Sequence, residues 1–198
     1  MKKLFVLALL AMFSTVTFAQ ITWNAQAGIN MSSISDMDDA KMKVGYQVGV
    51  GMEYAITDMW SVRPSLLFIT KGAKTDILGD DVKLNPMYLQ LPVMAAANFD
   101  LTDTMKFVAK AGPFIGVGIG GKAKLEEGNV EVKQDFFGDD EGQAGGKRFE
   151  FGLCIGAGLE FGKIMVNLDA MFGLTKVADF EEVTPRNMTV ALSVGYKF

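Results

Sequence analysis

The chain has 198 residues, a length that predicts one domain, and it carries 49% hydrophobic residues, no histidine and a formal net charge of −4. The acidic balance argues against a nucleic-acid partner, and the missing histidines remove the commonest general base and metal ligand. Beyond the first residues no run approaches the roughly eighteen apolar residues of a membrane-spanning helix, so the hydrophobic residues must serve another kind of structure.

Residues 1–19 have the layout of a secretory signal peptide. A basic start is followed by an apolar segment and then by small side chains at Thr17 and Ala19, which favour cleavage after residue 19. We therefore expect a mature domain over residues 20–198. The segment contains two lysines and no acid, so its removal changes the net charge from −4 to −6.

Four alternating segments follow. In each, apolar side chains take every second position and small or polar ones the positions between, which is the period of a β-strand with one apolar face. The predicted strands cover residues 21–31, 43–54, 60–68 and 88–99. Polar residues 32–42 and 71–83 are expected to form loops, and residues 56–58 a tight turn.

The second half repeats the pattern with four more segments. The predicted strands cover residues 105–120, 148–161, 164–175 and 188–198. Residues 100–104 form a short turn, and Gly162 with Lys163 makes a two-residue hairpin with glycine first, as a type II′ turn requires. Residues 121–147 are expected to form the longest loop and residues 177–186 the last one.

The connections alternate long, short, long, short along all eight predicted strands. Outer-membrane barrels have long external loops, short periplasmic turns and both termini on the periplasmic side. The sequence therefore predicts an all-β fold: an eight-stranded antiparallel up-and-down transmembrane β-barrel in the outer membrane, with its N- and C-termini periplasmic.

The period alone does not say which face of the sheet is outside. A soluble lipocalin-like barrel would place the apolar face inside. Three features favour the membrane barrel: the signal peptide, the carboxy-terminal strand and a girdle of aromatic residues near strand ends. The girdle residues are Trp23, Tyr54, Trp60, Phe99, Phe149, Phe161, Tyr196 and Phe198.

The final strand ends in an aromatic residue, which a soluble domain would seldom leave in water. Its apolar face has the spacing of the carboxy-terminal signal read by the barrel-assembly machinery, a terminal Phe with Tyr two positions before it. The assembly-signal residues are Val190, Leu192, Val194, Tyr196 and Phe198.

Three prolines lie inside predicted strands, at positions 64, 92 and 113. Proline cannot donate to the ladder and belongs at edges or bulges, whereas a closed barrel has no edge. We therefore expect bulges or missing ladder bonds there.

Two stretches resemble a known family. Residues 61–72 (Ser-Val-Arg-Pro-Ser-Leu-Leu-Phe-Ile-Thr-Lys-Gly) and 88–93 (Tyr-Leu-Gln-Leu-Pro-Val) look like the third and fourth strands of the small outer-membrane β-barrels of Bacteroidota that include the PorT-like proteins, often labelled porin-family. The resemblance covers essentially the whole mature chain and implies fold and location. Where the family often has an acid after the first proline, this chain has Ser65, so a role for that acid is not carried over. PorT itself is tied to type IX secretion and gliding.

The face opposite the apolar one carries charges of both signs, which we place in the lumen. The residues are Glu53, Arg63, Lys106, Lys110, Glu150, Glu160, Asp169 and Lys197. Because eight strands leave room for little more than side chains, a salt-bridged plug is favoured over an ion or proton pathway. With a turn at residues 56–58, Tyr54 lies opposite Trp60 and Glu53 lies diagonal to Arg63, near the periplasmic end.

No catalytic, cofactor or metal site is predicted. The acidic clusters at residues 36–39 and 139–141 lack a recognised Ca²⁺ loop spacing, residues 116–121 lack the Lys-Ser/Thr of a phosphate loop, and Cys154 has no base partner. We expect a non-enzymatic structural or surface-interaction barrel that contacts outer-membrane lipid, lipopolysaccharide and the barrel-assembly machinery. The alternatives are a narrow porin-like channel and a PorT-like secretion accessory.

Overall fold

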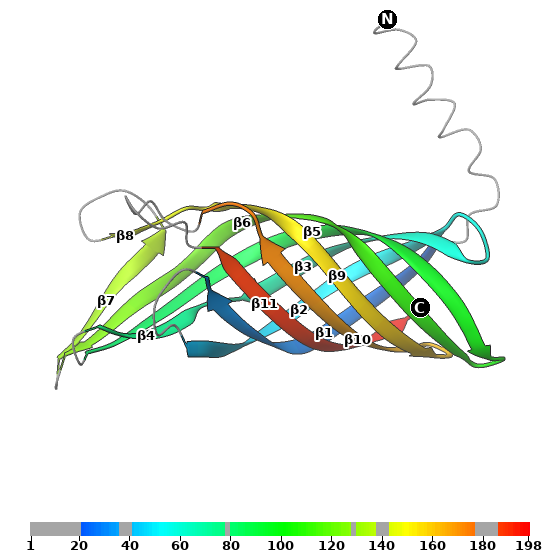
Figure 1. The fold of residues 1–198 in the computed structure, drawn as a ribbon, viewed down its shortest axis with the longest axis horizontal. Helices are drawn as coiled ribbons and strands as arrows, with labels where there is room; N and C mark the ends of the chain where they lie inside the picture. The colour runs from blue at the N-terminus through cyan, green and yellow to red at the C-terminus, as the bar shows by residue number, and fades with distance from the viewer. Residues whose placement is uncertain (1–20, 36–40, 78–79, 128–129, 138–142, 177–185) are drawn as a thin grey trace, which may run out of the picture.

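A computed structural model describes residues 21–35, 41–77, 80–127, 130–137, 143–176 and 186–198, so the predicted signal peptide lies outside the described residues. The described chain is built from β-strands (Figure 1). The strands are β1 (Ile21–Ile34), β2 (Lys41–Ala55), β3 (Trp60–Thr70), β4 (Ala73–Ile77), β5 (Asp80–Thr102), β6 (Met105–Glu127), β7 (Val130–Phe137), β8 (Gln143–Gly146), β9 (Phe149–Phe161), β10 (Ile164–Gly173) and β11 (Asn187–Lys197). Within these residues no helix is long and apolar enough to cross a membrane.

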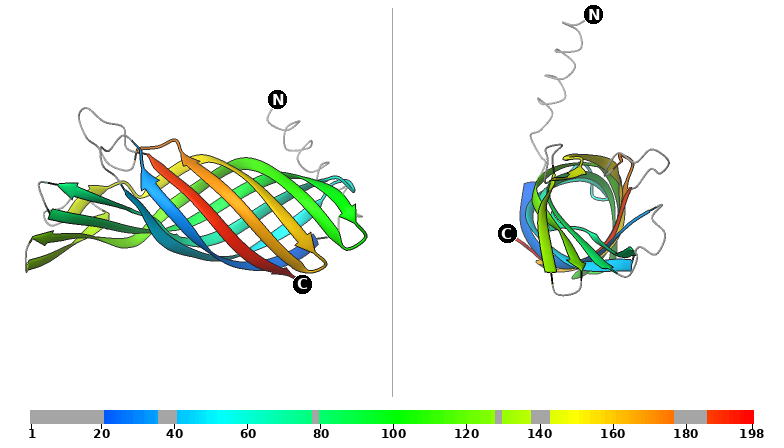
Figure 2. Two further views of the ribbon diagram at one scale, coloured as in Figure 1. Left: turned by 60° about the horizontal axis from the view of Figure 1, so that its bottom comes forward. Right: turned by 90° about the vertical axis from the view of Figure 1, so that its left-hand side faces the viewer.

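Eight of these strands close into a barrel. The ring runs β1-β2-β3-β5-β6-β9-β10-β11, each strand antiparallel to the next. It is closed by β11 and β1, whose register runs from Asn24 opposite Lys197 to Ile34 opposite Asn187. The right panel of Figure 2 shows the closed ring end-on. The predicted eight-stranded antiparallel barrel is confirmed.

The apolar face of every barrel strand points outward. The large side chains on it are about half exposed, whereas most of their neighbours in sequence are buried in the lumen. Examples around the ring are Trp23, Val48, Leu66, Val93, Ile115, Leu153, Leu168 and Leu192. Such a surface is stable in hydrocarbon and unstable in water.

The two ends of the barrel differ. At one end, here called the turn end, short connections join the strands, and Phe198 lies there. Gly162 has φ +56, which the first position of a two-residue hairpin requires. At the other end, here called the extension, four strands continue past the ring as a projecting sheet: β4, β7, the start of β5 and the end of β6 (Figures 1 and 2).

The prediction of loops at residues 71–83 and 121–147 is wrong, because these segments form much of the extension. Most of the described residues in both ranges are in strands. They were predicted as loops because charged residues interrupt the apolar pattern of both segments. Backbone pairing between neighbouring strands continues regardless: β5 and β6 stay paired out to Asp81 opposite Glu126.

The connection between β2 and β3 is also longer than predicted. It spans residues 56–59, because the Thr57 hydroxyl accepts hydrogen bonds from the backbone N–H groups of Met59 and Trp60 at 3.3 and 2.9 Å. The register therefore places Val62, and not Trp60, opposite Tyr54. On the same register Glu53 falls directly across from Arg63 and not diagonal to it, which keeps both on the inner face.

Each of the three prolines interrupts a ladder on one side without shifting the register. The missing pairs lie between β2 and β3 (residues 52–53 with 63–64), between β3 and β5 (65–66 with 91–92) and between β5 and β6 (93–94 with 112–113). The expected loss of ladder pairs is confirmed, and no bulge occurs at these positions. The gaps lie on neighbouring strands, so the pairing is weakened along one line that crosses β2, β3, β5 and β6.

Candidate functional site

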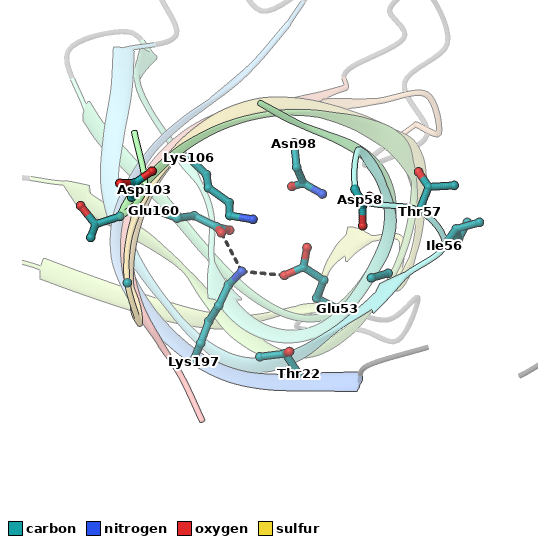
Figure 3. Close-up of a pocket in the computed structure, with 13 residues that line it drawn as sticks. Thr22, Glu53, Ile56, Thr57, Asp58, Asn98, Asp103, Lys106, Glu160 and Lys197 are labelled. Atoms are coloured by element: carbon teal, nitrogen blue, oxygen red, sulfur yellow. Dashed lines mark hydrogen bonds and ion pairs between the residues drawn. The ribbon is translucent and has the colours of Figure 1, made fainter. Parts of the chain in front are cut away.

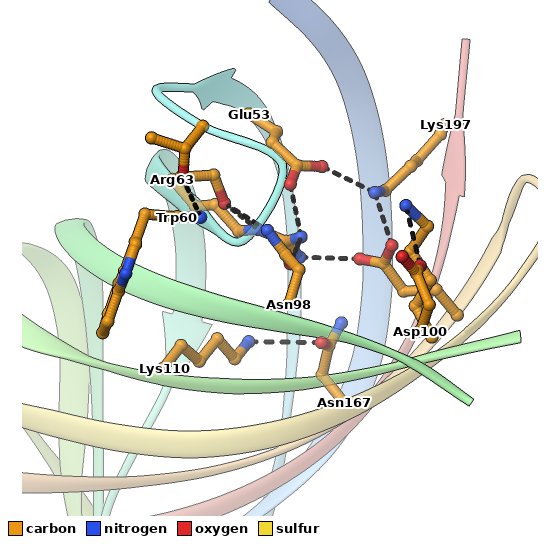
Figure 4. Close-up of polar contacts among 12 residues, drawn as sticks. Glu53, Trp60, Arg63, Asn98, Asp100, Lys110, Asn167 and Lys197 are labelled. Carbon is orange, nitrogen blue, oxygen red and sulfur yellow. Dashed lines mark hydrogen bonds and ion pairs between the residues drawn. The ribbon is translucent and has the colours of Figure 1, made fainter.

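The lumen near the turn end contains a closed ring of four charged side chains (Figure 4). Arg63 donates to Glu160 at 2.7 Å and to Glu53 at 2.5 Å. Lys197 donates to the second oxygen of the same two carboxylates, at 2.6 Å to Glu53 and 2.7 Å to Glu160. Arg63 also donates to Asn98 at 2.7 Å. Charges thus alternate around the ring, and each carboxylate has two cationic partners.

Burial strengthens the electrostatic attraction between the members of this ring. The four charged side chains are between 5% and 14% exposed, so solvent screens their attraction poorly. The strands β2, β3, β9 and β11 each supply one member, and the ring therefore ties opposite walls of the barrel together. The sequence places all four on the inner face.

A second ion pair lies farther into the barrel. Lys110 on β6 contacts Asp169 on β10 at 2.8 Å and donates to Asn167 at 3.2 Å. Gly156 of β9 lies between them: a Cβ there would be 2.0 Å from the Asp169 carboxylate. The absence of a side chain at this position lets the two charged groups meet across β9.

A third pair is buried toward the extension. Lys71 contacts both carboxylate oxygens of Glu150 at 2.9 Å, and Gln90 and Asn187 donate to the same carboxylate. The Lys71 ammonium also lies 5.1 Å from the ring centroid of Phe114, within cation–π range. Lys71 is 2% exposed, and four donor contacts from three side chains offset the desolvation of its partner.

Two phenylalanines from the extension cap this buried pair. Phe136 and Phe137 of β7 are each 3% exposed and pack edge to face, with centroids 4.9 Å apart. Phe137 packs in the same way on Tyr88, at 5.4 Å. A Cβ on Gly118 would be 2.3 Å from the Phe137 ring, so only glycine leaves this space. We call Tyr88, Phe136 and Phe137 the aromatic plug.

Lys106 is the one predicted lumen charge that lies outside these clusters. Its side chain is 50% exposed and contacts Asp100 at 3.1 Å. As the second residue of β6 it lies where the barrel opens, so it is not buried as predicted. It lines a cavity of about 660 Å³ at the turn end, whose floor includes Glu53, Glu160 and Lys197 (Figure 3).

The sequence prediction does not include Lys71 or the aromatic plug. The charged segment 71–83 predicts a loop, although Lys71 continues the inward positions 63, 65, 67 and 69 of β3, and this spacing is a signal for its burial. Phe136 and Phe137 had no such signal, because their partners lie far away in sequence.

One wall of the lumen carries polar atoms without partners. Asn30 on β1, Gln47 on β2, and Thr189 and Ser193 on β11 are each at most 2% exposed, and each has a polar atom with no hydrogen-bond partner among the described residues. These strands are adjacent, so the wall is continuous. Such groups usually contact water.

The described residues contain no group of three or more His, Cys, Asp or Glu side chains that could hold a metal ion. The acidic clusters at 36–39 and 139–141 lie outside the described residues. Cys154 is buried and 3% exposed, among the apolar side chains of the lumen.

The assembly-signal residues lie on the lipid-facing side of β11. Their exposed fractions are 46% for Val190, 48% for Leu192, 55% for Val194, 48% for Tyr196 and 69% for Phe198. Tyr196 and Phe198 pack against each other with centroids 5.7 Å apart, at the turn end.

Several solved barrels are similar to this chain. Ail, the attachment invasion locus protein of Yersinia pestis, is 16% identical over 89% of this chain and 98% of its own, with a TM-score of 0.42. Neisserial surface protein A is 14% identical over 90% and 99%, with a TM-score of 0.49. The outer membrane enzyme PagL is 16% identical over 87% and 98%, with a TM-score of 0.43. At this level the likenesses carry no argument about activity.

None of the curated proteins compared with the chain matches it. The family described as "Outer membrane protein beta-barrel domain" matches residues 18–179, most of the chain. That match agrees with the closed ring and its outward apolar face. The chain belongs to the outer membrane protein β-barrel domain family.

Proposed function

We propose that this protein is a non-enzymatic outer-membrane barrel that acts through its extension as a structural or surface-interaction protein. The observation that carries the proposal is the contrast between the two parts of the fold. The lumen is crossed by the charged ring, two further ion pairs and the aromatic plug, whereas four strands project beyond the ring as a sheet.

In the proposed orientation the extension faces outward and both termini are periplasmic. The short connections at the turn end support it, since outer-membrane barrels have short periplasmic turns and longer external segments. Residues 1–19 would then be a cleaved signal peptide, and the extension would lie beside lipopolysaccharide.

Deletion of the projecting sheet tests the proposal. Replacing residues 73–83 and 122–135 with short turns should leave the barrel folded and heat-modifiable on gels, and should change a surface property such as adhesion or surface-layer integrity. The purified wild-type protein should be silent in planar bilayers. Steady ion-selective openings of the wild type would contradict this function.

The alternative is a narrow channel, and the unpartnered polar wall favours it. A hydrated strip along β1, β2 and β11 would give small ions or protons a path beside the ion pairs. The same bilayer recording distinguishes the two roles.

The resemblance of residues 61–72 and 88–93 to PorT-like proteins of Bacteroidota supports a third role, an accessory of protein secretion. Deletion of the gene should then reduce secreted cargo, and normal secretion would exclude this role.

A further inference from the structure

A trough of about 570 Å³ runs along the outward surface of β1 near the turn end. Its floor is formed by Ala25 and Ala27, the two smallest side chains on the lipid-facing side of this strand. Its walls are the cross-strand partners of the two alanines: Val48 and Val50 on β2, and Val194 and Tyr196 on β11.

Larger side chains follow the two alanines in both directions along the strand. Trp23 and Ile29 occupy the next outward positions of β1 on either side, and they are 57% and 58% exposed. The two alanines therefore form the floor of an open apolar slot between taller side chains.

A positive charge lies at the turn-end mouth of the trough. The ammonium of Lys163 is 5.8 Å from the ring centroid of Tyr196, and the next residue, Ile164, borders the trough. Within the described part of the chain Lys163 has no ion-pair partner. Tyr196 lies beside this charge, and such amphipathic rings favour the level of lipid headgroups.

We propose that the trough binds one phospholipid, with an acyl chain over Ala25 and Ala27 and an anionic headgroup at Lys163. An acyl chain supplies the dispersion contacts that the slot would otherwise lack, and a lysine at the membrane surface attracts anionic lipid. In the orientation proposed above this lipid belongs to the periplasmic leaflet. The inference rests on that orientation only for the leaflet and is independent of what the extension does.

Lipid retention measures the site directly. The mature barrel is reconstituted in vesicles of phosphatidylglycerol and phosphatidylcholine, transferred to mild detergent, and weighed by native mass spectrometry. Wild type should keep one phospholipid, preferentially phosphatidylglycerol. Ala27→Phe fills the trough and should lose most of it. Lys163→Gln should lower phosphatidylglycerol retention about fivefold while leaving phosphatidylcholine unchanged, and Lys163→Arg should restore it.

Two variants serve as matched controls. Ala111→Phe adds the same ring to a lipid-facing position on β6, and Lys106→Gln removes a different turn-end lysine. Both should retain lipid like wild type. Equal retention by Ala27→Phe and Ala111→Phe would overturn the proposal. It would also be overturned if Ala27→Phe abolished a cross-linked dimer and not a bound lipid, since the occupant would then be a second copy of the chain. Neither result depends on conductance or on a surface phenotype.

Discussion

Arg63 and Lys197 share both of their carboxylate partners: Glu53 and Glu160 each accept from the two cations, at 2.5 to 2.7 Å. The guanidinium reaches one oxygen of each carboxylate and the ammonium reaches the other. Removing any one member therefore breaks two contacts at once.

Arg63→Ala should lower the stability of the barrel strongly. It leaves two buried carboxylates with one cation, and loss of a partner from a buried pair typically costs about 3–5 kcal/mol. Urea unfolding from lipid vesicles, followed by the heat-modifiable gel shift, measures the change. Glu53→Ala combined with Arg63→Ala should recover part of the loss, because the remaining charges are balanced. If both variants unfold at the same urea concentration as wild type, water screens the charges of the ring.

Lys106→Ala should have little effect in the same assay. Its partner Asp100 is 69% exposed, and exposed pairs contribute about 1 kcal/mol or less. A loss as large as that of Arg63→Ala would show that Lys106 is part of the buried network after all.

Gly118→Ala should displace the aromatic plug. The new Cβ would lie 2.3 Å from the Phe137 ring, so the ring must leave its site on Tyr88. Limited proteolysis should then cut the extension faster. Gly120→Ala is the matched control, because a Cβ there meets nothing within 4 Å. Identical digestion of the two variants would contradict the close packing.

Opening the lumen should require more than one change. Phe137→Ala clears space at the extension and Arg63→Ala removes one cation of the ring at the turn end, but each alone leaves the other layer and the two remaining ion pairs in place. We expect no steady conductance in planar bilayers from either single variant. Openings from either single variant would mean that one layer alone closes the barrel.

Replacing Tyr196 and Phe198 with Ser should block insertion by the barrel-assembly machinery. The change removes the aromatic pair at the end of β11 and the terminal part of the assembly signal. Surface labelling and outer-membrane fractionation measure the outcome, and Met188→Ser, at the opposite end of the same strand, should insert normally. Normal surface levels of the Tyr196 and Phe198 variant would show that the signal lies elsewhere.

The sequence by itself determined the eight strands of the ring and their two faces. A period of two is a local property, so the alternation over residues 188–198 already places Lys197 on one side and Tyr196 on the other. The alternation of long and short connections was enough to predict the eight strands of the ring, and the period of two placed Glu53, Arg63 and Glu160 on one face of the sheet.

Only the tertiary structure decided how long the strands are and which charges meet. Ring closure pairs β1 with β11 across the whole chain, and no local pattern encodes that contact. Backbone pairing between β5 and β6 continues through charged segments whose sequence predicts loops. The partner of Lys71 is Glu150, 79 positions away, and the site of Phe137 is a space above Gly118 that exists only once the barrel has closed.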